Sequence, residues 1–149
     1  MPEPRDRATR KADLLAALTA PAVDVWVATA APDATPYLVP LSLAWIDDRA
    51  VIALDGGSPT ARNIAASRVA RLAVGHTRDV VMIDAVLERS AGVDDDAHLG
   101  EAYAAQADWD PRGLSGYVFL VLRPTRIQAW RESNELAGRL LMRGGEWLV

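Results

Sequence analysis

The stretch that decides the fold is PYLVPLSLAWIDDRAVIALDGGSPTARNIAASRVARLAVG, residues 36–75. Residues 36–46 are apolar and include β-branched and aromatic side chains, a composition typical of a strand. Asp47-Asp48 interrupts the apolar run, and residues 50–54 resume it. Two apolar runs joined by a short polar pair favour a β-hairpin.

The residues after this hairpin predict the start of a short helix. Ser58 is a good N-cap. Pro59 occupies a position where a helix tolerates proline, because the N–H that proline lacks would have no partner there. We therefore expect a helix over residues 59–67, followed by a strand over residues 71–75.

The first turn of this helix carries groups that suit a phosphate. A helix start has unpaired N–H groups and the positive end of the helix dipole. Two hydroxyls, a guanidinium and an amide accompany them, from Ser58, Thr60, Arg62 and Asn63. Such groups form charge-assisted hydrogen bonds with phosphate oxygens. A helix that begins Gly-Ser-Pro also commonly caps only itself, so both interpretations remain open.

The rest of the chain predicts one mainly β domain, residues 1–149, with peripheral helices. Half of the residues are hydrophobic, which is enough to form a core. Alternating or continuous apolar segments typical of strands lie at residues 23–30, 79–88, 116–122 and 127–130. Helical patterns lie at residues 5–19, 94–107 and 134–142, the last ending at Gly144-Gly145.

Composition excludes several classes of function. A net charge of −4 and a pI near 5.1 argue against a nucleic-acid-binding surface. No run of apolar residues is long enough for a membrane span, and the N-terminal residues lack a secretory h-region, so a cytoplasmic protein is expected. There are no cysteines, and the acidic run Asp94–Asp96 lacks EF-hand spacing, so no metal site is predicted.

The deciding stretch resembles the FMN-binding split barrel of the pyridoxamine 5'-phosphate oxidase-like superfamily. In that family a strand of the type V-P-L-x-x-x-W precedes a hairpin, and a loop of the type S-x-K-x-x-N/Q precedes a short helix. This chain has Val39-Pro40-Leu41, Trp45, Ser58 and Asn63 at these positions. The resemblance covers roughly residues 20–145 and implies a six-stranded antiparallel split β-barrel.

The chain departs from the family pattern in three places, at four residues. Thr60 stands where the family has lysine, and we expect Arg62 to supply the missing positive charge. Ser67-Arg68 replaces an asparagine-proline pair at the helix end, and Ala85 replaces a glycine in a long strand. These departures bear on phosphate binding more than on the fold.

The resemblance implies bound FMN or, alternatively, an 8-hydroxy-5-deazaflavin coenzyme of the F-420 type, with its phosphate at the helix start. The residues expected to line the ring and the phosphate are Val39, Leu41, Ser42, Asp55, Ser58, Thr60, Arg62 and Asn63. Arg78 is a further candidate for an anion contact. The resemblance also implies a homodimer with the cofactor at the subunit interface, in which Trp130, and with it Arg139, reaches the cofactor of the other subunit. Trp130 as a plain dimer-core residue remains the alternative.

The function implied by the resemblance is an FMN-dependent oxidoreductase acting on a small molecule. A deazaflavin-dependent reductase and a non-catalytic flavin-binding module are the alternatives. No catalytic residue is predicted, because the flavin itself carries the redox chemistry. Trp109 is expected either to cover a substrate pocket or to fill the core. The apolar end Trp147-Leu148-Val149 is expected to be covered by a partner chain.

Overall fold

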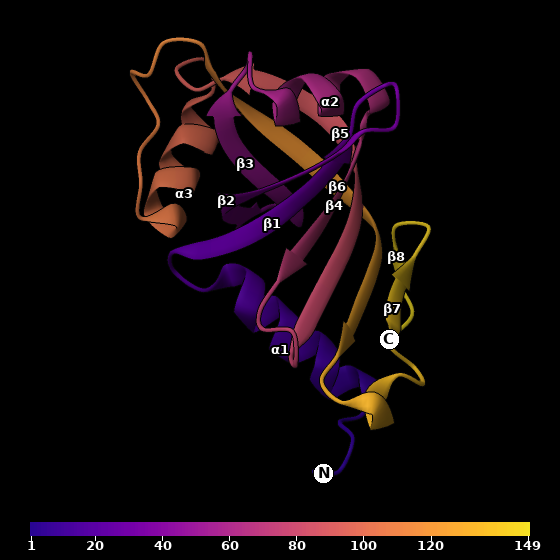
Figure 1. The fold of residues 1–149 in the computed structure, drawn as a ribbon. Helices are drawn as coiled ribbons and strands as arrows, with labels where there is room; N and C mark the ends of the chain where they lie inside the picture. The colour runs from indigo at the N-terminus through magenta and orange to yellow at the C-terminus, as the bar shows by residue number, and fades with distance from the viewer.

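A computed structural model describes all 149 residues, and six antiparallel strands in it form a closed barrel (Figure 1). The strand order is β3-β2-β1-β4-β5-β6, and a further pairing of β3 with β6 closes the sheet on itself. The mainly β, six-stranded antiparallel barrel predicted from the sequence is confirmed. The barrel strands are β1 (Val23–Ala30), β2 (Pro36–Ile46), β3 (Arg49–Asp55), β4 (Val69–Val74), β5 (Val80–Gly92) and β6 (Tyr117–Trp130).

Three helices surround the barrel, and two of them contribute to its interior. Figure 1 shows α2 above the barrel and α1 across its lower end, and we use upper and lower in this sense below. Leu14 and Leu18 of α1 and Ile64 of α2 are fully buried in the same core as the inward side chains of the strands. The helices are α1 (Arg7–Thr19), α2 (Pro59–Ser67) and α3 (Ala97–Ala107).

The third helix, α3, covers the outer surface of β2, β3 and β6 and forms a second core there. Tyr103 of α3 is fully buried and packs beside Phe119 of β6. Gln106 ties three elements together. Its side-chain oxygen accepts a hydrogen bond from the Trp45 backbone N–H at 2.7 Å, and its nitrogen donates to the Leu18 carbonyl at 2.7 Å.

Each helix begins at a side-chain cap. Ser58 accepts a hydrogen bond from the Ala61 N–H, which confirms the predicted N-cap with Pro59 in the first turn. Asp6 and Asp96 cap α1 and α3 in the same way. These two helices therefore start two or three residues later than expected, because an aspartate at the boundary satisfies the free N–H groups of the first turn.

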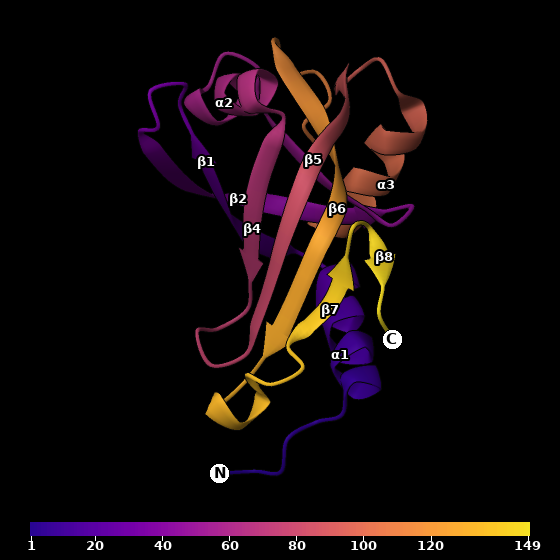
Figure 2. The same cartoon turned by 90° about the vertical axis from the view of Figure 1, so that its right-hand side faces the viewer.

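The outer surface of β1, β4 and β5 has no helix over it, as Figure 2 shows for β4 and β5. Apolar side chains on this surface and on the adjoining strand β2 are exposed: Trp26 is 51% exposed, Leu38 of β2 59% and Val69 51%. Trp26 stands opposite Pro40 of β2 and Ala73 of β4. We call this area, centred on Trp26, the open outer face.

The helix expected over residues 134–142 is wrong. The segment contains one turn of 3-10 helix, Ser133–Glu135, and then a hairpin of β7 (Leu140–Arg143) and β8 (Glu146–Trp147). Gly144 and Gly145 both have positive φ, 60° and 79°, which a two-residue hairpin turn requires. The glycine pair therefore joins two strands and does not end a helix.

Two strands are longer than expected. The strand predicted at residues 79–88 extends to Gly92, and residues 117–130 form one continuous strand. Asp84 pairs with Arg126 and Ala85 with Pro124, so one residue of β6 is left over as a bulge. A bulge accommodates Pro124, since proline cannot donate a ladder hydrogen bond.

The C-terminal end is covered in part by its own chain. The Lys11 ammonium lies 4.5 Å from the centre of the Trp147 ring and donates to the Val149 carbonyl at 2.8 Å. Trp147 also packs against the barrel core. Trp147 is therefore covered in part by its own chain, whereas Leu148 and Val149 are 38% and 41% exposed, and the expected partner chain stays a prediction. Separately, none of the helices combines the length and apolar character needed to cross a membrane.

Candidate functional site

A cavity of about 510 Å³ opens at the upper end of the barrel, beside the start of α2. It brings together six of the ten residues predicted to bind a cofactor, namely Val39, Leu41, Ser42, Asp55, Ser58 and Thr60. Its remaining lining residues are Tyr37, Pro40, Ala53, Leu54, Pro59, Trp109 and Tyr117. We call this space the upper cavity. Its volume lies in the range of small-molecule sites.

The start of α2 offers hydrogen-bond donors to this cavity. The Ser58 hydroxyl accepts from the Ala61 N–H at 3.3 Å, so its own proton can still be donated to a ligand. Thr60 is only 3% exposed, and no hydrogen bond within the chain engages its hydroxyl. Thr60 lines the cavity, so its free hydroxyl can donate to a ligand bound there.

One carboxylate lines the same cavity. The Asp55 side chain accepts a hydrogen bond from the Gly57 N–H at 2.8 Å and is exposed. Its negative charge opposes an anion at the helix start. The Asp55 carboxylate therefore does not suit a phosphate.

Arg62 and Asn63 line a separate hollow of about 400 Å³ next to the upper cavity. The two spaces adjoin, because Tyr37 and Pro59 line both. The Asn63 amide donates to the Thr29 hydroxyl at 3.1 Å and is buried, so it serves the packing of α2 on β1. Arg62 is exposed and makes no ion pair within the chain.

The structure does not bring Arg78 and Trp130 to the upper cavity. Arg78 makes an ion pair with Glu132 at 2.7 Å, and Trp130 pairs with Val80 at the lower end of β6. The upper cavity lies near Tyr117, at the other end of the same strand. With a rise of about 3.3 Å per residue, the two ends of β6 are roughly 40 Å apart.

Sequence reasoning missed most of the aromatic side chains of the upper cavity. Tyr37 and Tyr117 were not predicted, and for Trp109 the two alternatives were a pocket cover and a core residue. Trp109 lines the cavity and is 38% exposed, so it does not fill the core, although its ring contacts that of the core residue Tyr103. The contacts come from segments distant in the sequence, so no local pattern signals them.

Tyr103 connects this aromatic group to the cavity strand β2. Its hydroxyl donates to the Ser42 carbonyl at 3.0 Å. Burial raises the pKa of the Tyr103 phenol to about 12, so it remains a neutral donor at physiological pH. Tyr103 therefore holds α3 against the part of β2 that lines the cavity.

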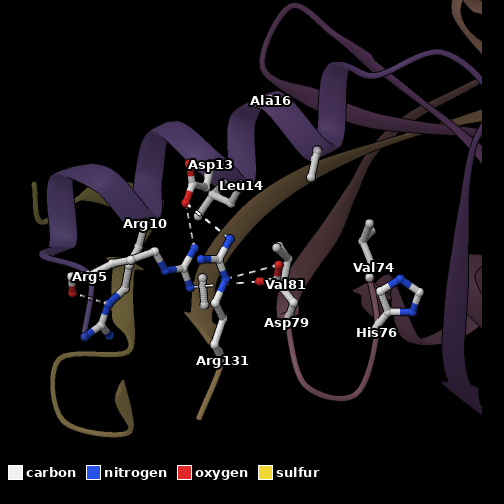
Figure 3. A pocket seen from close by; sticks show the side chains of 13 residues that line it. Arg5, Arg10, Asp13, Leu14, Ala16, Val74, His76, Asp79, Val81 and Arg131 are labelled. Carbon is white, nitrogen blue, oxygen red and sulfur yellow. Dashed lines mark hydrogen bonds and ion pairs between the residues drawn. The ribbon is translucent and has the colours of Figure 1, made fainter. Parts of the chain in front are cut away.

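A second cavity, of about 280 Å³, lies between α1 and the β4–β5 turn (Figure 3). Its charged residues pair with one another. Arg131 contacts the carboxylates of Asp79 at 3.2 Å and Asp13 at 3.7 Å, and Arg5 contacts Asp13 at 2.8 Å. These charges neutralise each other and come from four separate segments. We therefore interpret the cluster of Arg5, Asp13, Asp79 and Arg131, which we call the seam, as a set of structural ion pairs that hold α1 against the barrel.

Buried Glu135 extends this seam. It accepts hydrogen bonds from the Arg5 guanidinium and from the backbone N–H groups of Arg5 and Arg131. The Arg5 side chain is the main cause that lowers the pKa of Glu135 to about 2. Arg10 is also buried and donates to the Glu135 carbonyl at 2.9 Å.

Comparison with known proteins identifies the family. The family model described as pyridoxamine 5'-phosphate oxidase matches residues 13–131, which is most of the chain. No curated protein sequence matches it.

Solved structures share the fold at low sequence identity. An F420 reductase is 19% identical, with 75% of this chain and 94% of that chain covered and a TM-score of 0.62. A heme-binding protein from Mycobacterium smegmatis is 21% identical, with 95% and 59% covered and a TM-score of 0.65. A pyridoxamine 5'-phosphate oxidase-related, FMN-binding protein from Nostoc punctiforme is 18% identical, with 83% and 78% covered and a TM-score of 0.52. Given the barrel and the extent of the family match, the chain belongs to the pyridoxamine 5'-phosphate oxidase-like, FMN-binding split-barrel superfamily.

Proposed function

We propose that the protein binds FMN in the upper cavity and acts as an oxidoreductase on a small molecule. The observation that carries the proposal is the gathering of six predicted cofactor residues around one cavity of about 510 Å³. They come from β2, from the end of β3 and from the start of α2. The FMN-binding relative from Nostoc punctiforme supports the same choice of cofactor.

In this proposal the residues of the chain orient the cofactor and exclude water from its ring. Val39 and Leu41 provide apolar contact for the ring, and the unpartnered Thr60 hydroxyl and the Ser58 hydroxyl donate to the phosphate. Arg62 supplies positive charge from the adjoining hollow. When bound, the flavin supplies the hydride or electron transfer.

The proposal includes a homodimer formed through the open outer face. Exposed Trp26, Leu38 and Val69 make this face suitable for burial against a second copy. Trp130 and Arg78 lie too far from the upper cavity of their own chain to contact its ligand. We therefore propose that Trp130 reaches the cofactor of the other subunit in this dimer.

A deazaflavin coenzyme is the second candidate cofactor. The F420 reductase among the similar structures favours it, and so does the hollow beyond Pro59. A coenzyme with a longer tail than FMN would continue from the upper cavity into that hollow. A flavin-binding module without turnover is the third candidate.

The visible spectrum of the purified protein tests the proposal first. We expect flavin absorption, or binding of added FMN at micromolar concentration in a fluorescence titration. A parallel titration with the deazaflavin coenzyme separates the two cofactors. Binding of the deazaflavin alone would replace FMN as the cofactor, and binding of neither would overturn the proposal. Bound FMN that no nicotinamide nucleotide reduces would favour the binding module.

A further inference from the structure

We propose that Tyr37, Trp109 and Tyr117 form an aromatic wall that selects planar, conjugated rings, and that Trp109 is its specificity-determining residue. The inference deepens the proposed function, since it concerns the same cavity. The three rings come from β2, from the α3–β6 connection and from the start of β6. The wall therefore forms only in the folded chain.

The indole of Trp109 is held in place yet remains available to a ligand. Its ring lies 6.1 Å from that of Tyr103 at 71°, and 6.3 Å from that of Tyr117 at 75°. Edge-to-face contacts of this kind are favourable and fix the ring's orientation. Trp109 is nevertheless 38% exposed and lines the cavity, so part of its apolar surface is still to be covered.

The connection that carries Trp109 is ordered by polar contacts on its C-terminal side. The Gly113 N–H donates to the Asp94 carboxylate at 3.0 Å. Arg112 pairs with Asp110 at 2.8 Å and with Glu101 of α3 at 3.5 Å. A loop that is already ordered loses little conformational entropy when a ligand binds. The favourable contact with Trp109 is therefore offset less than it would be in a flexible loop.

Tyr103 connects Trp109 of the aromatic wall with strand β2. It contacts the Trp109 ring, while its hydroxyl donates to the Ser42 carbonyl in β2. Tyr103 therefore joins the connection that carries Trp109 to β2, the strand that carries Val39 and Leu41. A cavity lined by aromatic and aliphatic side chains favours a flat ring over a bulky saturated ligand, because stacking requires a planar partner.

The test compares lumiflavin, which has the ring but no phosphate tail, with FMN. Both are titrated into the wild-type protein and into variants at position 109, with binding followed by flavin fluorescence and by calorimetry. Trp109→Ala should weaken binding of both ligands about tenfold, the scale of an aromatic stacking contact. Trp109→Phe should retain affinity within about threefold, because it keeps a planar ring at the same position.

Two further variants control for folding. Leu114→Ala truncates an exposed residue of the same connection that does not line the upper cavity, and it should bind both ligands as the wild type does. Trp109→Leu keeps apolar volume beside Tyr103 without an aromatic ring. If Trp109→Ala does not fold, Trp109→Leu should still bind about tenfold more weakly than Trp109→Phe.

The outcomes separate this inference from the proposed function. FMN binding that is equal in the wild type, Trp109→Ala and Trp109→Leu would overturn the aromatic wall and leave the proposed function standing. If lumiflavin binding depends on Trp109 but FMN binds no more tightly than lumiflavin, the aromatic wall is supported and the phosphate part of the proposed function is overturned. Absence of binding for both ligands would overturn both.

Discussion

Arg62 is the residue on which positive charge at the proposed phosphate site depends, since the family lysine is Thr60 here. Arg62→Ala should weaken FMN binding by about 1.5–3 kcal/mol, the contribution of a charge-assisted hydrogen bond. Lumiflavin, which lacks phosphate, should bind unchanged. Calorimetric titration of both ligands measures the difference. Arg143→Ala is the matched control, because Arg143 is an exposed arginine of β7 outside both spaces. Equal FMN affinity in the wild type and Arg62→Ala would remove Arg62 from the site.

Single residues also show which parts of the site the sequence could predict. Ser58 and Pro59 were placed correctly, because capping depends on neighbours three residues away. The partner of Asn63 was not predicted. Thr29 lies 34 positions away, and the hydrogen bond between them forms only once α2 packs on β1. Whether a polar residue faces a ligand or a neighbour is decided by tertiary packing.

At the scale of elements, the seam around Glu135 attaches α1 to the barrel. The pKa of Glu135 is lowered from 4.5 to about 2 by its bonds to Arg5 and Arg131. A lowered pKa in the folded state means that the folded chain favours the charged form. The contribution of ionised Glu135 to the free energy of unfolding is therefore fully present above about pH 4.5, and it is lost as the pH falls toward 2.

Glu135→Gln should therefore destabilise the protein by about 3 kcal/mol at pH 7, because it removes the nearest charge partner of Arg5 and the carboxylate beside buried Arg10. The destabilisation should shrink as the pH falls below 4.5, where the wild type loses the same contribution. Urea unfolding at pH 7 and at pH 3 measures both values. Glu132→Gln is the control, since its partner Arg78 is exposed, and it should change stability by less than about 1 kcal/mol. A constant difference across this pH range would contradict the assignment.

The elements differ in how well the sequence predicted them, and the reason is physical. The hairpin of β2 and β3 carries a long apolar run and a polar pair, so its signal is local and strong. The segment of residues 134–142 is short, and a short segment with apolar residues fits a helix or a strand equally well. The contact that decides is the pairing of Met142 with Ile127 of β6, which no local pattern contains.

For the whole molecule, the proposed dimer makes Trp130 the residue that connects assembly with cofactor binding. Trp130→Ala should increase the fraction of monomer in sedimentation velocity and also weaken FMN binding, because the second chain would complete the site. Leu114→Ala, which lies away from the open outer face, should change neither property. A stable dimer with unchanged FMN affinity would contradict the role of Trp130 across the interface.

The closure of the barrel by β3 and β6 also has a kinetic consequence. Asp55 pairs with Tyr117 and Ala50 with Leu122, so the strands that meet are separated by the whole middle of the chain. Contacts between such distant segments form slowly, typically in milliseconds to seconds. Until they form, β3 and β6 present unpaired backbone groups to other chains in solution. Refolding from denaturant should therefore succeed best at high dilution, where the two strands meet each other before they meet a neighbouring molecule.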